Sequence, residues 1–359
     1  MTSTEGSPIL PGRLGSPEMA LKDDPRADPR MIAAMEPIGL ADAPMTAPVD
    51  SESAIEDILG FVSMSESGFE ALFSGLAIDL PPVEGVTSSV EVIRGVDGND
   101  VTLFIHRPTN LDRPVPGILH LHGGGMVMLE AAGSGYVRWR NELAAVGLVV
   151  VGVEFRNGAG KHGPYPFPAG LNDCSSALHW VTDNKDRLGI STVIVSGESG
   201  GGNLTLATTL KAKQDGRLGE IDGVYAQCPY ISNAYAAKRP ELVSLYENDG
   251  FFLSCDMSGA LARAYDPSGE NDTNPLAWPY YASRSDLEGL PPHVISVNQL
   301  DPLRDEGLAY YRKLLDAGVS AVGRTVNGTV HAGDCIFRGA MPDVYSATIR
   351  DIKGFADSL

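Results

Sequence analysis

One serine in this chain of 359 residues lies in a segment that would expose its hydroxyl group for chemistry. The segment GESGG, residues 197–201, follows the β-branched run 192–195 and precedes the helix-compatible run 203–213. A G-x-S-x-G segment between a strand and a helix makes a tight, strained turn, and its glycines leave room for the two elements to cross. The free N–H groups at the start of the helix then point to where a substrate carbonyl would become an oxyanion. We therefore predict that Ser199 is a nucleophile.

A nucleophilic serine needs a base that removes its proton and an acid that orients the base. Only two histidines follow Ser199 in the sequence, His293 and His331. His293 begins a predicted strand, at the end remote from Ser199. His331 lies in a loop just after the last predicted strand, so we expect His331 to be the base.

The orienting acid should follow the predicted strand 293–297 at its carboxyl end. Asp301, Asp305 and Glu306 lie there. Asp301 comes first, and Pro302 suits the first turn of a helix. Asp305 and Glu306 are then typical of carboxylates that stabilise a helix N-terminus. We expect Asp301 to be the acid, with Asp305 as the alternative.

The sequence His122-Gly-Gly-Gly125 follows another predicted strand. An oxyanion is stabilised by backbone N–H groups that are fixed before the reaction, and glycine lets the backbone approach the substrate closely. We predict that Gly124, Gly125 and Gly200 donate these hydrogen bonds.

The elements that position these residues follow a β-α-β rhythm after an initial hairpin, whose turn is 95–100. This order predicts an α/β fold with a mostly parallel eight-stranded sheet and helices on both faces. Residues 1–85 form an N-terminal arm and cap helices, 86–359 form the catalytic domain, and the insertion 231–282 contributes to the cap. The cap helices are expected within 53–76 as two amphipathic segments broken near 65–68, and one short helix is expected near 29–35. The predicted strands are 89–94, 101–107, 117–122, 148–154, 192–196, 223–227, 293–297 and 322–326, and the later predicted helices are 136–145, 168–184, 203–213, 306–317 and 344–356.

Four segments, taken in order, resemble the hormone-sensitive-lipase-like branch of the α/β-hydrolases. They are HGGG at 122–125, GESGGG at 197–202, DPLRDEG at 301–307 and HAGD at 331–334. The resemblance covers roughly residues 86–359. It implies a carboxylesterase with an N-terminal cap. One bacterial member that the whole sequence resembles opens a macrocyclic lactone.

The chain departs from the usual pattern of that branch at three positions. Glu198 and Gly200 replace the usual Asp and Ala beside the nucleophile, although Gly200 keeps its N–H group. Met126 follows the glycines where an aromatic residue is common. Met126 either widens a pocket for the acyl group or only fills space in the core.

Composition excludes several classes of protein. The formal charge of −19 and the sequence pI of about 4.7 disfavour nucleic acid and anionic membranes as partners. No apolar run reaches the ~20 residues that span a bilayer, so no membrane insertion is expected, and the N-terminus shows no secretory signal. We expect a cytoplasmic protein without cofactor or metal, because the four scattered cysteines and the histidines form no ligand motif. Pairing of two copies through the edge strand 322–326 is left open.

These observations predict a serine carboxylesterase whose partner is a small, uncharged, apolar ester or lactone. Two other readings remain open. One is an amidase or peptidase with the same three residues. The other is a ligand receptor on the same fold that has lost catalysis.

Overall fold

The computed structural model describes residues 10–359 and contains one eight-stranded sheet. The strand order is β1-β2-β4-β3-β5-β6-β7-β8. β2 is antiparallel to both β1 and β4, and every later pairing is parallel. The strands are β1 (Val86–Arg94), β2 (Asp100–Pro108), β3 (Val115–Leu121), β4 (Val149–Glu154), β5 (Ile190–Glu198), β6 (Gly223–Gln227), β7 (His293–Asn298) and β8 (Ala321–Val326). The predicted α/β fold with a mostly parallel eight-stranded sheet is confirmed, and so is the initial hairpin.

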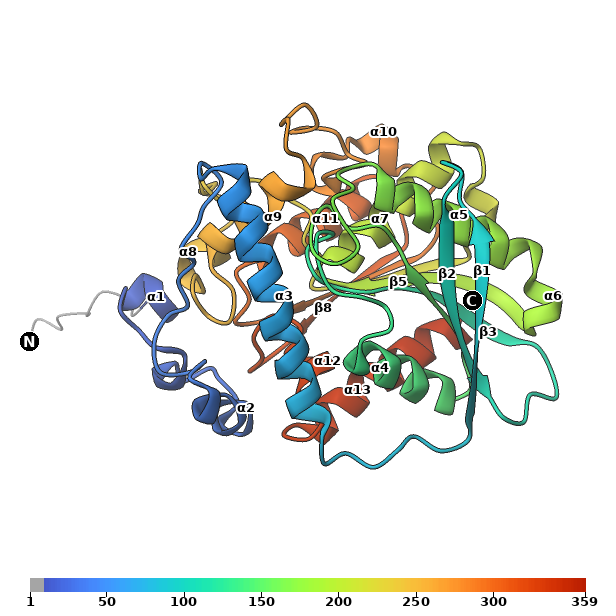
Figure 1. Ribbon diagram of the computed structural model, residues 1–359, viewed down its shortest axis with the longest axis horizontal. Coiled ribbons are helices and arrows are strands. Elements are labelled where there is room, and N and C mark those ends of the chain that lie inside the picture. Colours follow the sequence, from blue (N-terminus) through green and yellow to red (C-terminus); the bar gives the residue numbers. More distant parts are fainter. Residues whose placement is uncertain (1–9) are drawn as a thin grey trace, which may run out of the picture.

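Helices cover both faces of this sheet (Figure 1). α5 (Ala169–Asp183), α7 (Gly200–Gln214) and α11 (Arg304–Asp316) lie on one face, and α4 (Ser134–Ala145) and α13 (Pro342–Asp357) lie on the other. The central strands β4 and β6 are buried along nearly their whole length, because apolar side chains on both of their faces pack against these helices. The remaining helices are α1 (Gly12–Gly15), α2 (Pro29–Met35), α3 (Ile55–Ala77), α6 (Lys185–Leu188), α8 (Ser244–Glu247), α9 (Cys255–Tyr265), α10 (Arg284–Leu287) and α12 (Gly333–Ile336), with short 3₁₀ turns at Leu21–Asp23, Glu36–Ile38, Leu218–Glu220 and Pro279–Tyr281.

The expectation of two helices within residues 53–76 is wrong, because α3 is one continuous helix of 23 residues. The segment 65–68 contains two serines and a glycine, which are poor helix formers. Tertiary contacts carry the helix through it: the buried Glu66 accepts hydrogen bonds from the backbone N–H groups of Leu129 and Lys161, at 2.8 and 3.0 Å. α3 also packs against α9 of the insertion and against α4 (Figure 1). The division of the chain into an arm with cap and a catalytic domain stays a prediction.

The N-terminal arm is packed against the rest of the molecule. Leu21, Met31, Met35 and Ala41 are buried in the main hydrophobic core. The predicted short helix near 29–35 is α2, which begins at a proline and is capped by the side chain of Asp28. The arm therefore contributes to the core despite its many prolines and acidic residues.

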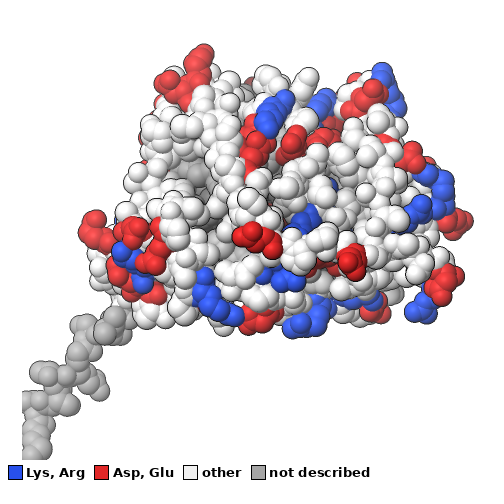
Figure 2. All heavy atoms as spheres, turned by 60° about the horizontal axis from the view of Figure 1, so that its bottom comes forward, with Lys and Arg blue, Asp and Glu red and all other residues white. Residues whose placement is uncertain are grey.

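Acidic and basic side chains are interspersed over the face shown in Figure 2. Many of the charged side chains that the structure describes form ion pairs, such as those of Arg138 and Arg338 with Glu142. Of the helices that the structure describes, none has both the length and the apolar run needed to cross a bilayer.

Candidate active site

The turn after β5 holds Ser199 in a strained backbone conformation, with φ 58° and ψ −120°. A positive φ is costly for a residue with a side chain, and the surrounding hydrogen bonds maintain it. The Ser199 N–H donates to the Gln227 carbonyl, and the Ser199 carbonyl accepts from Tyr230, both at 3.0 Å. α7 begins at Gly200, so its N-terminus lies directly beside the serine, as the sequence predicts.

The structure brings His331 and Asp301 together. Nδ1 of His331 lies 2.7 Å from Oδ2 of Asp301, and both side chains are buried. The other carboxylate oxygen of Asp301 accepts the Leu303 N–H at 2.8 Å. Nε2 of His331 has no hydrogen-bond partner among the described residues, and His331 lines the same cavity as Ser199. His331 thus presents a free nitrogen to the cavity while its other nitrogen is held by a carboxylate.

Asn298, the last residue of β7, fixes the loop that carries His331. Its amide nitrogen donates to Thr329 at 2.8 Å and to Asp334 at 2.9 Å, and its oxygen accepts the Ala332 N–H at 3.2 Å. These contacts lie on both sides of His331 in the sequence. Sequence reasoning missed this role, because an asparagine at a strand end has no distinguishing spacing.

The N-terminal arm also contacts the histidine loop. The Asp28 N–H donates to the Gly328 carbonyl at 2.9 Å, and Sδ of Met31 lies 3.5 Å from the Val330 nitrogen. The arm therefore packs directly on the residues that precede His331. Its composition gave no sign of this contact.

The three glycines expected to bind an oxyanion lie close together. Gly124 and Gly125 have positive φ values of 105° and 62° and line the cavity with Ser199. A Cβ atom added at Gly200 would lie 2.6 Å from the Gly125 nitrogen and 2.5 Å from the Met126 nitrogen. The turn and the glycine loop are thus in contact, and a side chain at position 200 would require the loop to shift.

The structure places Met126 outside the lining of the main cavity. Met126 has a φ of 61°, is buried in the hydrophobic core and is not among the residues that line the main cavity. The left-handed backbone turns the chain there, so Met128 and Leu129 line the cavity instead. The alternative that Met126 only packs in the core fits the structure.

The other candidates lie away from the cavity. His293 begins β7, is buried, and its Nδ1 lies 2.6 Å from the Pro291 carbonyl oxygen. Asp305 accepts the Ser244 N–H at 2.8 Å and Glu306 accepts the Ile231 N–H at 2.7 Å. Burial raises the pKa of Glu306 to about 8. Both carboxylates lie in the first turn of α11, as expected, and both also hold the insertion.

Two cysteines lie near the predicted catalytic residues. Sγ of Cys228, a carboxylate oxygen of Asp301 and a ring nitrogen of His331 lie within 4.8 Å of one another, which is close enough for three metal ligands. Burial raises the pKa of the Cys228 thiol well above its ordinary value, and Nδ1 of His331 is already held by Asp301. Cys335 lines the cavity and is partly exposed.

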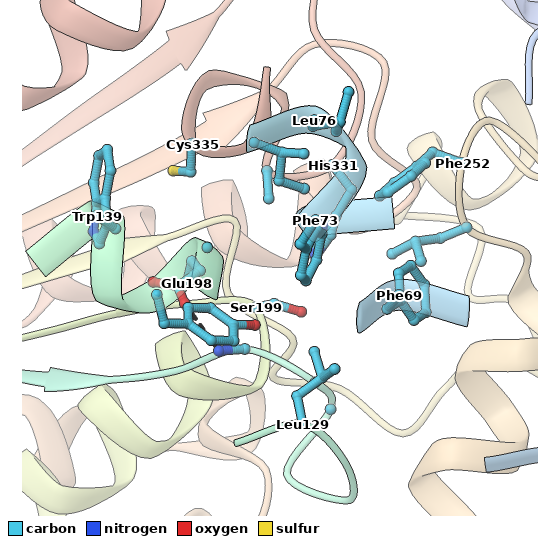
Figure 3. Close-up of a pocket in the computed structure, with 18 of the residues that line it drawn as sticks. Phe69, Phe73, Leu76, Leu129, Trp139, Glu198, Ser199, Phe252, His331 and Cys335 are labelled. Atoms are coloured by element: carbon cyan, nitrogen blue, oxygen red, sulfur yellow. Dashed lines mark hydrogen bonds between the residues drawn. The ribbon is translucent and has the colours of Figure 1, made fainter. Parts of the chain in front are cut away.

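The cavity around Ser199 is predominantly apolar (Figure 3). In this view Phe69 and Phe252 lie on one side of Ser199, while Trp139 and Cys335 lie on the other, and Phe73 of α3 faces the serine. The space, open mouth included, measures about 1080 Å³. The remaining lining comes from α3, α4, the insertion and the segment after His331, and includes Leu76, Leu80, Tyr136, Leu253, Met257, Leu261, Ile336 and Tyr345.

A sheet that delivers a strained serine to the tip of a parallel strand, opposite a glycine loop and a histidine–aspartate pair, defines the α/β-hydrolase class. Comparison with known proteins agrees. A family model described as the alpha/beta hydrolase fold matches residues 118–333. Esterase LipI of Mycobacterium tuberculosis is 30% identical over 304 residues, which cover 82% of this chain and 90% of that protein. An arylesterase of Saccharolobus solfataricus is 30% identical over 223 residues, covering 60% of this chain and 67% of that protein.

Solved structures give the same result. A brefeldin A esterase, described as a bacterial homologue of human hormone-sensitive lipase, shares 46% identity and a TM-score of 0.94, covering 97% of this chain and 98% of its own. The esterase Est22 shares 36% identity and a TM-score of 0.84, covering 94% and 99%. The chain therefore belongs to the α/β-hydrolase family, in its hormone-sensitive-lipase-like branch, and is a carboxylic ester hydrolase.

Proposed function

We propose that the chain hydrolyses an uncharged, apolar ester or lactone through an acyl-enzyme on Ser199. The observation that carries this proposal is that Ser199, His331 and Gly123–Gly125 all line one apolar cavity, with His331 bonded to Asp301 behind it.

The proposed reaction has two halves. His331 Nε2 takes the hydroxyl proton as Ser199 Oγ attacks the carbonyl carbon, and the N–H groups of Gly124, Gly125 and Gly200 stabilise the resulting oxyanion. Collapse breaks the carbon–oxygen bond to the alcohol, which takes the proton from His331. Water then gives a proton to His331 and attacks the acyl carbon. The second collapse releases the acid and returns the proton to Ser199.

The lining supports an uncharged substrate. Three charged side chains, Arg138, Glu198 and Arg338, line the cavity among the described residues. Both arginines form ion pairs with Glu142, and Glu198 accepts a hydrogen bond from the Gly123 N–H. A charged substrate group would lose its hydration without a free partner of opposite charge, which is unfavourable.

A macrocyclic lactone is our proposed substrate within this class. The structural neighbour with 46% identity is named for brefeldin A, and the predominantly apolar lining of the cavity suits an uncharged lactone. Opening of such a ring leaves the new acid and the new alcohol on one molecule.

A matched pair of substrates tests the class. p-Nitrophenyl butyrate and p-nitrophenyl hemisuccinate differ chiefly in a terminal carboxylate, and we expect kcat/KM to be about 100-fold higher for the butyrate because the carboxylate must be desolvated. Equal values would contradict the proposed preference.

Incubation with brefeldin A, followed by mass spectrometry, should show the ring-opened hydroxy acid, and an unchanged lactone would remove it as a substrate. p-Nitroacetanilide serves as the amide control: turnover comparable to that of the esters would favour an amidase.

A further inference from the structure

Glu198, the residue before the nucleophile, links the strained turn to the glycine loop. It is the last residue of β5 and is buried. Oε1 accepts the Gly123 N–H at 2.9 Å, and Oε2 lies 3.1 Å from Nε2 of His120 on β3. One carboxylate therefore connects β5 to β3 and to the loop that follows β3. Glu198 lies beside Ser199 at the edge of the cavity (Figure 3).

His120 fixes the orientation of this carboxylate. Burial lowers the pKa of His120, so its ring is neutral near pH 7 and carries one proton. Nδ1 has no hydrogen-bond partner among the described residues, while Nε2 faces an acceptor. The proton is therefore on Nε2, which donates to Oε2 and leaves Oε1 directed at Gly123.

The hydrogen bond from Gly123 to Glu198 holds the residue that directly precedes Gly124 and Gly125, whose N–H groups need a fixed orientation. Gly124 and Gly125 both have positive φ values, and three successive glycines have great conformational freedom. Oxyanion stabilisation requires donors that are already in place when charge develops. The anchored N–H of Gly123 limits this freedom at the start of the loop.

We propose that Glu198 is a positioning residue that sets the orientation of the Gly124 and Gly125 N–H groups toward the oxyanion. This inference rests on the proposed function, in which those groups stabilise the oxyanion. Because Glu198 is also bonded covalently to Ser199, one residue couples the position of the nucleophile to that of the donors. Hydrogen bonding, rather than the charge of the carboxylate, performs this task.

Two substitutions separate hydrogen bonding from charge. Glu198→Gln keeps an oxygen for Gly123, and its amide N–H can donate to His120 in the other tautomer. Glu198→Ala removes both contacts. Asp173→Ala is the matched control, because Asp173 is an equally buried carboxylate that accepts a backbone N–H, from Arg156 at 2.9 Å, and does not line the cavity.

The assay compares kcat and KM for p-nitrophenyl butyrate with the inhibition constant of an alkyl trifluoromethyl ketone. In this inhibitor Ser199 Oγ bonds to the ketone carbon, the carbonyl π bond becomes an oxyanion, and the serine proton moves to His331. We expect Glu198→Ala to lower kcat about 10- to 100-fold, less than or equal to the loss of a whole donor, with KM within about twofold. The inhibition constant should weaken by the same factor as kcat/KM. Glu198→Gln should stay within about threefold of the wild type in all three quantities, and Asp173→Ala should lower only the melting temperature.

Unchanged kcat and inhibition in Glu198→Ala would overturn the inference, and an equally large loss in Glu198→Gln would assign the effect to charge instead. If Glu198→Ala does not fold, His120→Asn frees Oε2, and it should lower kcat and weaken inhibition in equal proportion; unchanged values would overturn the inference. Failure of the proposed function looks different, because the trifluoromethyl ketone would then fail to inhibit the wild type.

Discussion

Replacing Asp301 by asparagine tests the histidine–aspartate pair through the position of one proton. The two carboxylate oxygens of Asp301 have different partners: Oδ1 accepts the Leu303 N–H at 2.8 Å, and Oδ2 lies 2.7 Å from His331 Nδ1. Asparagine has only one oxygen. Because the Leu303 N–H can only donate, that oxygen should stay with Leu303, and the new NH₂ group then faces Nδ1.

The consequence is a change of tautomer. Nδ1 must accept the NH₂ hydrogen, so the ring proton moves to Nε2, which can no longer take the proton of Ser199. We expect kcat to fall about 10⁴-fold, which corresponds to about 5.5 kcal/mol of activation free energy. KM and the melting temperature should change little, because asparagine has the size of aspartate and burial of the neutral amide needs no charge compensation.

The matched control is Asp305→Asn, four residues further on. Asp305 is bonded to the Ser244 N–H and to Arg304, and it has no contact with His331. Its substitution should lower kcat by less than about threefold. Both variants are assayed with p-nitrophenyl butyrate under saturation. If Asp301→Asn keeps more than about 1% of the wild-type kcat, or if Asp305→Asn loses more, the assignment of the acid is refuted.

Two further predictions concern stability and the cap. Burial lowers the pKa of His293 from 6.5 to about 4, so the unfolded chain takes up this proton first. The neutral, buried His293 therefore contributes to the free energy of unfolding above pH 6.5, and this contribution, up to about 3 kcal/mol, is lost as the pH falls toward 4. Urea unfolding at pH 7 and 4.5 should show a smaller loss in His293→Gln than in the wild type, and equal losses would contradict the reasoning. Glu66→Ala leaves the Leu129 and Lys161 N–H groups without their acceptor, which should cost about 2 kcal/mol or more. Phe69 and Phe73 of the same helix line the cavity, so the KM of Glu66→Ala should rise for p-nitrophenyl octanoate but not for p-nitrophenyl acetate. An equal rise for both esters would show that α3 does not bind the long acyl chain.

The sequence predicted the sheet and the strained serine because both depend on local signals. Apolar β-branched runs at regular spacing indicate buried parallel strands, and the G-x-S-x-G segment between a strand and a helix indicates the turn at Ser199. The pairing of His331 with Asp301 followed from chain order, since the carboxyl ends of parallel strands meet at one edge of the sheet. The structure places these two side chains 2.7 Å apart.

The features that were missed depend on contacts between distant segments. Glu66 and Leu129 are far apart in the chain, so nothing in the local sequence showed that α3 continues through its serines and glycine. The contact of Met31 with the histidine loop has the same origin. The left-handed backbone at Met126 was missed for another reason: a positive φ is disfavoured for methionine, so the residue type does not predict it.

Labelling of Ser199 tests the central claim, that catalysis proceeds through a covalent intermediate on this residue. The wild type is incubated with diethyl p-nitrophenyl phosphate, and the modified peptide is located by mass spectrometry while residual esterase activity is measured. We predict one diethylphosphoryl group on Ser199, loss of activity in proportion to labelling, and a fall in kcat of about 10⁴-fold or more in unlabelled Ser199→Ala. Stoichiometric labelling of another residue, or more than a few per cent of wild-type kcat in Ser199→Ala, would contradict the account.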